Sequence, residues 1–238
     1  MSAPLDILQR DLVTASRILA AEDILDGFGH VSVRHPEHAD RFLLSRARAP
    51  ELVTPADILE FDLEARPVQP TEARLFAERA IHACLYRARP DVQAVCHHHA
   101  PAVLPFCVSG VALVPVFHLG ATMGATVPFW DSRDEFGATD LLVSSAEQGL
   151  SLARALGANS MVLMRRHGAT VVARSLPELV FRSVYAARNA ELQQRAMLLG
   201  GVSPLTPGEC AAAGEFNLRP IAVDRAWELW QQRVGARA

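Results

Sequence analysis

The chain has 238 residues, of which 50% are hydrophobic and 21% are charged, and 23 basic against 26 acidic residues give a net charge of −3. This composition supports a sizeable buried core and excludes an intrinsically disordered chain. No basic run is present, so we expect neither nucleic acid nor an anionic membrane surface as a partner.

The N-terminus and the cysteines both favour a reducing compartment. Residues 1–9 lack the basic and apolar regions of a secretory signal, and no stretch reaches about 18 uncharged apolar residues, so we expect a cytoplasmic protein. The four cysteines lie in apolar surroundings without CxxC spacing. This pattern favours reduced, buried thiols over disulfides, with a catalytic cysteine left open. The four are Cys84, Cys96, Cys107 and Cys210.

Helices and strands alternate in the first half of the chain. Apolar residues spaced three and four apart predict two helices, at 5–21 and at 71–87. The predicted strands are short and rich in apolar or β-branched residues, and lie at 31–33, 42–44, 58–63 and 92–99.

The second half continues the same alternation. The predicted strands are 161–164, 170–172 and a weaker edge candidate at 113–116, with an irregular segment at 128–130. The predicted helices are 140–156, a long one from Ser175 to about Leu199, and two more starting at Thr206 and Val223. Ser175 and Glu178 have the spacing of a capping box.

These elements predict one α/β domain over residues 1–238, with a central mixed sheet, helical layers on both faces and C-terminal helices from about residue 205. An antiparallel hairpin around His167 argues against an all-parallel sheet. No glycine-rich phosphate loop is present, which makes nucleotide binding a minor possibility.

Three histidines are candidate metal ligands. Strand geometry places His97 and His99 on one side of their strand and His98 on the other, so that two imidazoles can bind one divalent ion. His167 stands at a tight turn before Gly168, where its ring can point inward. Three imidazoles would leave an open position for a substrate oxygen. The alternatives are a solvated histidine cluster and a histidine that caps a turn.

Glu78 precedes the His-x-His strand and is a candidate fourth ligand or general acid/base. An exposed helical glutamate is the alternative interpretation. His82 follows four residues later on the same predicted helix face, so a Glu78/His82 pair is a competing arrangement.

The order and spacing of four segments resemble the class II aldolase/adducin-head family, from about Leu5 to Leu199. They are Gly29 to Arg34, Glu78, Arg89 to Ala100 and Arg166 to Gly168. The resemblance implies a three-layer α/β/α fold and a homotetramer with active sites at subunit interfaces. It also implies one divalent metal ion per subunit, held at the positions of His97, His99 and His167, with Glu78 as the acid/base.

The chain departs from the sugar-phosphate aldolases of this family at the positions that hold phosphate. It has His30 in place of asparagine, and Phe76 and Ala77 in place of a serine pair. Phenylalanine and alanine have no side-chain donor, so a phosphorylated sugar is not expected as the substrate.

The segment Ser45-Arg46-Ala47-Arg48-Ala49-Pro50, together with the Gly-His-Val-Ser element, is similar to the decarboxylase branch of the family. That branch acts on hydroxy-substituted aromatic or heteroaromatic dicarboxylates and on carboxy-hydroxymuconic semialdehydes, which belong to aromatic catabolism. Guanidinium groups bind carboxylates with paired donors. The predicted substrate-binding residues are Ser32, Ser45, Arg46, Arg48 and His118, with a salt-bridged loop and a core histidine as the alternatives.

The expected activity is that of a metal-dependent carbon–carbon lyase, with a carboxy-lyase favoured over an aldehyde-lyase. The metal stabilises negative charge on a substrate oxygen, Glu78 or His30 protonates the carbanionic carbon, and an arginine of the 46–48 loop orients the retained carboxylate. Zinc, manganese, iron, cobalt and nickel all suit three imidazoles. The alternatives are a retro-aldol lyase acting on a non-phosphorylated hydroxy acid and a non-catalytic domain like the adducin head.

Overall fold

A computed structural model of the chain describes residues 5–235. The outermost residues of the predicted 1–238 domain, and part of the N-terminal segment inspected for a signal, lie outside this range. Within it, no helix is long and apolar enough to cross a membrane.

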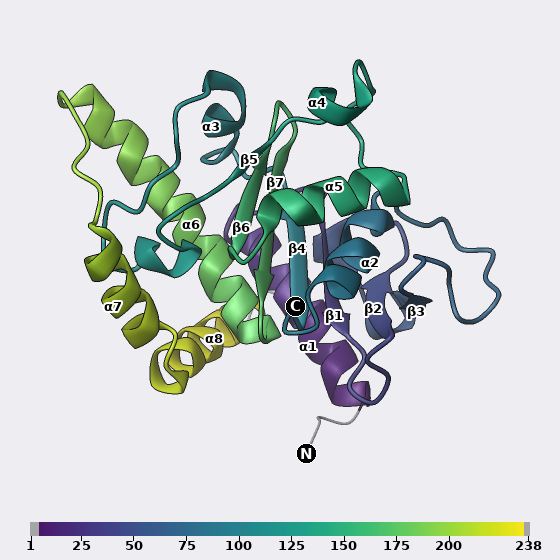
Figure 1. Cartoon of the computed structure of the whole chain (residues 1–238). Helices are drawn as coiled ribbons and strands as arrows, with labels where there is room; N and C mark the ends of the chain where they lie inside the picture. Colours follow the sequence, from purple (N-terminus) through teal and green to yellow (C-terminus); the bar gives the residue numbers. More distant parts are fainter. Residues whose placement is uncertain (1–4, 236–238) are drawn as a thin grey trace.

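A mixed seven-stranded sheet forms the centre of the molecule, as predicted (Figure 1). The strand order is β3-β2-β1-β4-β7-β6-β5, and every pair is antiparallel except β5 with β6. The strands are β1 (His30–Arg34), β2 (Arg41–Ser45), β3 (Ile58–Asp62), β4 (Ala94–His98), β5 (Phe129–Trp130), β6 (Met161–Met164) and β7 (Gly168–Ala173).

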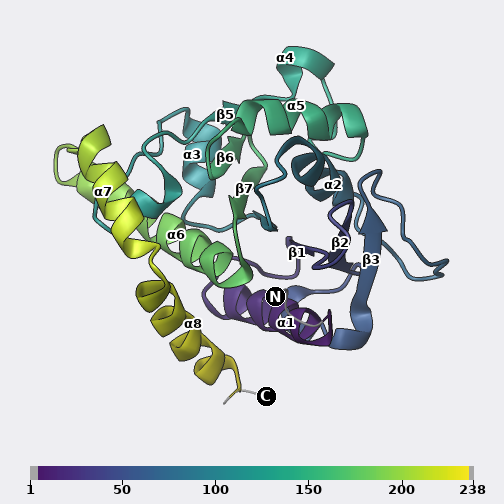
Figure 2. The same cartoon turned by 60° about the horizontal axis from the view of Figure 1, so that its bottom comes forward.

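Helices cover both faces of the sheet, which gives the expected α/β/α sandwich (Figures 1 and 2). One apolar core lies between the sheet and the layer of α1 (Leu5–Ala21) and α6 (Leu176–Leu198). The other lies between the sheet and the layer of α2 (Arg79–Ala88) and α5 (Ala146–Leu156). The remaining helices are α3 (Leu104–Ser109), α4 (Arg133–Phe136), α7 (Pro207–Asn217) and α8 (Pro220–Gly235), with 3₁₀ turns η1 (Pro50–Leu52), η2 (Pro55–Asp57) and η3 (Gly120–Met123).

Side chains along the central strand β4 alternate between the two cores. Ala94 and Cys96 belong to the core under α1 and α6, whereas Val95 belongs to the core under α2 and α5. This two-residue period is the ordinary geometry of a strand. It directs His97 toward α2 and His98 to the opposite face.

Three predicted elements differ from the structure. Helix α2 begins only at Arg79, so the helix predicted from residue 71 is wrong over its first eight residues, and α5 begins at Ala146 rather than at 140. No strand forms at 113–116. There the amides of Val114 and Val116 donate to the side chains of Gln193 and Asn189 on α6, which replace a strand partner.

The C-terminal half otherwise follows the predicted order. Phe129 and Trp130 form a short strand beside β6 in the segment expected to be irregular. Ser175 caps α6 by accepting from the Glu178 amide. The Glu178 side chain instead binds Arg174 and Arg182, so the reciprocal half of the predicted capping box is absent.

The hairpin that follows His167 requires a glycine. A Cβ on Gly168 would overlap the His98 carbonyl oxygen of the neighbouring strand and lie 2.8 Å from His99 Cδ2. Gly168→Ala is therefore expected to lower the free energy of unfolding by about 1–3 kcal/mol in urea titrations. Gly208→Ala is the control, because nothing lies near its Cβ position and alanine favours a helix. Equal stability of the two variants would contradict this account.

Candidate metal centre and active-site cavity

The end of β4 brings sequence-distant residues to one edge of the sheet. β4 pairs antiparallel with β1 and with β7, so both neighbours begin where β4 ends. In the register, His30 lies opposite His97, and Ala169 lies opposite His98. The start of β1, the end of β4 and the turn before β7 therefore meet at this edge.

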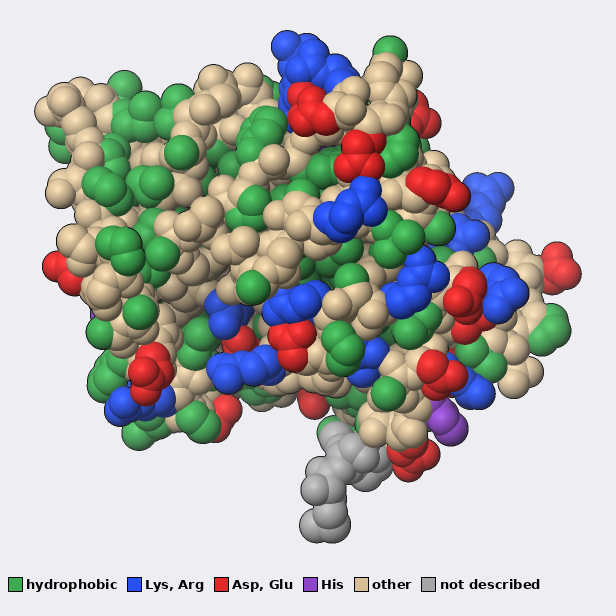
Figure 3. Space-filling view, in the orientation of Figure 1, with side chains coloured by type: hydrophobic (Ala, Val, Ile, Leu, Met, Phe, Trp, Pro, Cys, Tyr) green, Lys and Arg blue, Asp and Glu red, His purple; other side chains and the backbone are tan. Residues whose placement is uncertain are grey.

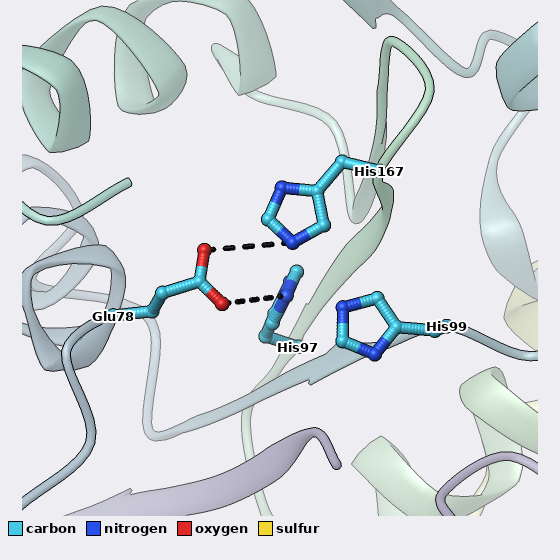
Figure 4. Close-up of side chains that lie close together, drawn as sticks. All are labelled: Glu78, His97, His99 and His167. Atoms are coloured by element: carbon cyan, nitrogen blue, oxygen red, sulfur yellow. Dashed lines mark ion pairs between the residues drawn. The ribbon is translucent and has the colours of Figure 1, made fainter. Parts of the chain in front are cut away.

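Glu78, His97, His99 and His167 converge at this edge, as Figure 4 shows. Each residue offers one potential ligand atom, and these atoms all lie within 4.8 Å of one another. The centroids of the three imidazole rings are 4.8 to 5.1 Å apart. The structure thus brings together the four residues that the sequence offered as metal ligands or acid/base.

The turn before β7 sets the orientation of His167. Arg166 adopts a left-handed backbone conformation with φ of 52°, which closes the turn. His167 Nδ1 lies 2.8 Å from the Leu141 carbonyl oxygen and donates to it. A ring that carries its proton on Nδ1 presents the lone pair of Nε2, so His167 can bind a metal through Nε2. Nε2 faces the Glu78 carboxylate at 3.5 Å.

Glu78 directs its carboxylate at two of the histidines. It lies at the N-terminal end of α2 and is largely buried. Oε2 is 3.4 Å from His97 Nε2, and Oε1 accepts a hydrogen bond from the Val143 amide. Burial alone would raise the pKa of Glu78, but the His167 and His97 rings that face its two carboxylate oxygens hold that pKa well below its usual range. The competing Glu78/His82 pair does not form.

The donor set fits a divalent cation. His97 Nε2 is fully buried and has no hydrogen-bond partner among the described residues, although it points at the cluster. Burial, with the neighbouring His97 and His167, lowers the pKa of His99 to about 4, so this ring is neutral at pH 7. Neutral imidazoles and a carboxylate are ordinary ligands for zinc and for other first-row metals.

A cavity of about 380 Å³ opens beside the cluster. Its walls are largely apolar, and three polar side chains, Glu78, His30 and His99, reach it together with Arg48. The other lining residues are Gly27, Phe28, Gly29, Ala47, Ala49, Leu75, Phe76, Ala77 and Leu142. A mostly apolar cleft with a few convergent polar groups is typical of a small-molecule site.

The two predicted loop arginines share one carboxylate. Asp57 accepts from Arg46 Nε at 2.6 Å and from a terminal nitrogen of Arg48 at 2.7 Å. The Thr54 amide and hydroxyl also donate to Asp57. Burial would raise the pKa of Asp57, but these donors hold it well below its usual range. Arg48 lines the cavity, whereas Arg46 and Ser45 are not among its lining residues.

His30 and Ser32 occupy alternate positions on β1, but only His30 reaches the cavity. Ser32 is completely buried and binds His82 and Tyr86, so the structure does not bring it to the cavity. His30 Nδ1 lies 2.7 Å from His82 Nε2, and the His30 ring packs against Phe76. Burial lowers the pKa of His82 to about 3.

His118 lies away from this cavity. It lines a separate pocket with residues of α6, α7 and α8, and its carbonyl oxygen accepts from Asn217. Within the described chain, the structure therefore does not bring it to Glu78 and the three histidines.

Several residues of the site were missed from the sequence. The Leu141 carbonyl and the Val143 amide fix His167 and Glu78, and Tyr86 ends a buried chain of polar groups behind His30. The main-chain contacts have no signature in residue type. Tyr86 does have a sequence signature. It follows His82 by four residues and so shares its face of α2, while polar residues alternate along β1.

Comparison with known proteins identifies the family. The profile of the Class II Aldolase and Adducin N-terminal domain matches residues 10–194, and the chain belongs to this family. Decarboxylase tropJ of Talaromyces stipitatus is 36% identical over 98% of this chain and 96% of its own length. A 3,4-dihydroxyphthalate decarboxylase of Terrabacter sp. is 31% identical over 86% of this chain and 88% of its own. The family and these relatives support a lyase.

Solved structures show the same fold. An L-fuculose 1-phosphate aldolase from Glaciozyma antarctica has a TM-score of 0.79 at 22% identity, covering 96% of this chain and 88% of its own. An aldolase II superfamily protein from Pseudomonas syringae has a TM-score of 0.81 at 20% identity, covering 100% and 96%. These likenesses confirm the predicted class II aldolase-like sandwich.

Proposed function

We propose that the protein is a divalent-metal-dependent decarboxylase of an ortho-hydroxy aromatic or heteroaromatic dicarboxylate, such as a dihydroxyphthalate, or of a related carboxy-hydroxymuconic semialdehyde. The observation that carries the proposal is the Glu78, His97, His99 and His167 cluster beside an apolar cavity. The relatives named decarboxylases support the carboxy-lyase assignment.

His97, His99 and His167 would hold the ion. When bound, a divalent cation supplies a positive charge that stabilises the electrons left behind as the carbon–carbon bond breaks. Glu78 and His30 lie at the cavity, within reach of a bound substrate, and one of them returns a proton to the carbon that has lost carbon dioxide. The apolar walls exclude water from that carbon.

The cavity walls suit a flat ring better than a sugar phosphate. Phe28, Leu75, Phe76 and Leu142 offer apolar surface, and Phe76 and Ala77 provide no side-chain donor for a phosphate. Figure 3 shows arginine and acidic side chains interspersed on one face of the molecule, without a continuous basic surface there. These features favour a small molecule with a flat ring over a sugar phosphate.

Arg48 is the proposed carboxylate ligand on the protein. A single terminal nitrogen of its guanidinium binds Asp57, so within the described residues its other donors remain free for a substrate at the cavity wall. Arg48→Gln is expected to raise KM by about tenfold to a hundredfold, the effect of losing a charged hydrogen bond of about 1.5–3 kcal/mol.

Arg46→Gln is the matched control for the arginine prediction. It removes the other ion pair to Asp57 without changing the cavity lining. We expect a smaller change in KM than for Arg48→Gln, measured as initial rates of carbon dioxide release over a range of substrate concentrations. An equal effect of the two variants would show that the loop matters only through Asp57.

A product assay tests the proposed function. Protein supplied with manganese or zinc is incubated with a panel of ortho-hydroxy aromatic dicarboxylates, and carbon dioxide and aldehyde are measured in the same vials. Metal-dependent carbon dioxide without aldehyde is the expected result. Aldehyde release would move the assignment to a retro-aldol lyase, and silence in both channels with metal bound would contradict the ring-dicarboxylate proposal.

We also propose that the protein assembles as a homotetramer, as the family resemblance implies. Light scattering of the purified protein tests this, with a mass of four chains as the expected result. A monomer would contradict the proposal.

A further inference from the structure

A buried chain of polar groups runs from the cavity into the core beneath α2. His30 Nδ1 lies 2.7 Å from His82 Nε2, His82 Nδ1 lies 2.6 Å from Ser32 Oγ, and Ser32 Oγ lies 2.8 Å from the Tyr86 hydroxyl. His82, Ser32 and Tyr86 are almost completely enclosed, with exposures of 0%, 0% and 1%. We call these four residues the His30 chain.

The His30 chain is closed at its inner end. Within the described residues, the Tyr86 hydroxyl has one hydrogen-bond partner, Ser32, and Ser32 has only Tyr86 and His82. The Arg34 guanidinium lies over the Tyr86 ring and donates its hydrogen bonds to carbonyl oxygens. It is therefore not a hydrogen-bond partner of the Tyr86 hydroxyl. A buried hydroxyl that donates to nothing is costly, so Tyr86 must donate to Ser32.

The direction of the first hydrogen bond fixes all the others. Because Ser32 Oγ accepts from Tyr86, the Ser32 hydroxyl proton has only one remaining acceptor, His82 Nδ1. A neutral His82 that accepts at Nδ1 carries its proton on Nε2 and donates it to His30 Nδ1. A neutral His30 that accepts at Nδ1 must carry its proton on Nε2. Charged imidazoles would be strongly disfavoured at such depth.

The outer nitrogen of His30 is available to a ligand. Within the described residues His30 Nε2 has no hydrogen bond. The fully buried atoms that lack a partner do not include it, so this nitrogen is not fully enclosed. His30 lines the cavity beside Glu78 and His99. The chain therefore ends in an N–H group at the cavity wall.

We propose that His82, Ser32 and Tyr86 are positioning residues that lock His30 in the Nε2–H tautomer, so that His30 donates a hydrogen bond to a substrate oxygen. The contribution to catalysis rests on the proposed function, but the tautomer itself does not. This assigns His82 a role distinct from the pairing with Glu78 considered from the sequence.

Neutron diffraction of crystals of the zinc-loaded protein tests the tautomer without any assay of activity. Deuterium on Nε2 of His30 and of His82, and none on either Nδ1, is the expected result. Deuterium on Nδ1 of His30 would overturn the proposal, whatever reaction the protein catalyses.

Substitutions at Ser32 test the positioning role. Ser32→Ala removes the donor to His82 Nδ1 and is expected to lower kcat/KM by about 10- to 100-fold, as for other residues that orient a functional histidine. Ser32→Thr keeps the hydroxyl and is expected to recover most of the loss. Ser16 is a buried serine on a different element, α1. Ser16→Ala therefore controls for the loss of a core hydroxyl and should behave as the parent protein does.

The outcomes separate this proposal from the proposed function. Loss in Ser32→Ala with recovery in Ser32→Thr supports the positioning role, whereas equal activity of Ser32→Ala and the parent would overturn it. If the parent protein decarboxylates nothing in the panel, the proposed function fails, and the neutron map still decides whether His30 carries its proton on Nε2.

Discussion

Replacing His97 by alanine is expected to abolish metal binding and lower kcat by about a thousandfold or more. Among the described residues of the cluster, His97 is the only histidine with a fully buried ring nitrogen, Nε2, that has no hydrogen-bond partner. Loss of a bound cation removes several kcal/mol of charge stabilisation in the transition state, and each 1.36 kcal/mol is a factor of ten in rate. Metal content by mass spectrometry and carbon dioxide release measure the two effects.

The fold should survive this substitution. His97 is near the end of β4, so the hydrogen bonds of the ladder do not depend on its ring. Circular dichroism checks the secondary structure, and His38→Ala, which removes an exposed histidine, is the control. A folded, metal-free His97→Ala protein that still released carbon dioxide would refute the metal assignment.

Glu78→Gln is expected to lower kcat by about 10²- to 10⁴-fold, the usual contribution of a general acid or base. Glutamine retains the size of the side chain and an oxygen that can accept from the Val143 amide, so the local structure should remain. The change removes the negative charge that faces His97 and His167. Steady-state kinetics and metal content are measured on the same preparation.

The metal content divides the two roles considered for Glu78. A slow variant that keeps its metal indicates an acid/base, whereas a slow variant that has lost it indicates a ligand. Glu147→Gln, at an exposed position on α5, controls for loss of an acidic side chain. Parent-like rates for Glu78→Gln would exclude both roles.

The sequence was sufficient to predict the sheet and its main helices because their patterns are local. Strand alternation predicted that His97 and His98 point to opposite faces, and the structure confirms this through the cores that Val95 and Cys96 join. The apolar spacing around Leu75 misled the prediction of a helix from residue 71. Leu75 and Phe76 instead line the cavity, a contact that depends on distant parts of the chain.

The candidate site was predictable only in part. His97, His99 and His167 were identified from spacing and family resemblance, and they do come together. The partner of the loop arginines was not predictable, since Asp57 lies nine residues beyond Arg48 and forms part of a separate 3₁₀ turn.

The hydrogen bonds behind His30 were not predictable either. They join β1 to α2 across about 50 residues of sequence, with His30 to His82 separated by 52 and Ser32 to Tyr86 by 54. The two-residue period of polar side chains on a buried strand was the available sign. It indicated that something polar lies opposite, but not which residue.

Reconstitution of metal-stripped protein tests the central claim most directly. Carbon dioxide release from a dihydroxyphthalate is followed while manganese or zinc is added back to protein freed of metal by a chelator. We expect little activity at first, then a rise that stops at one ion per chain. Full activity of the stripped protein, or carbon dioxide release that is indifferent to the added ion, would contradict the account.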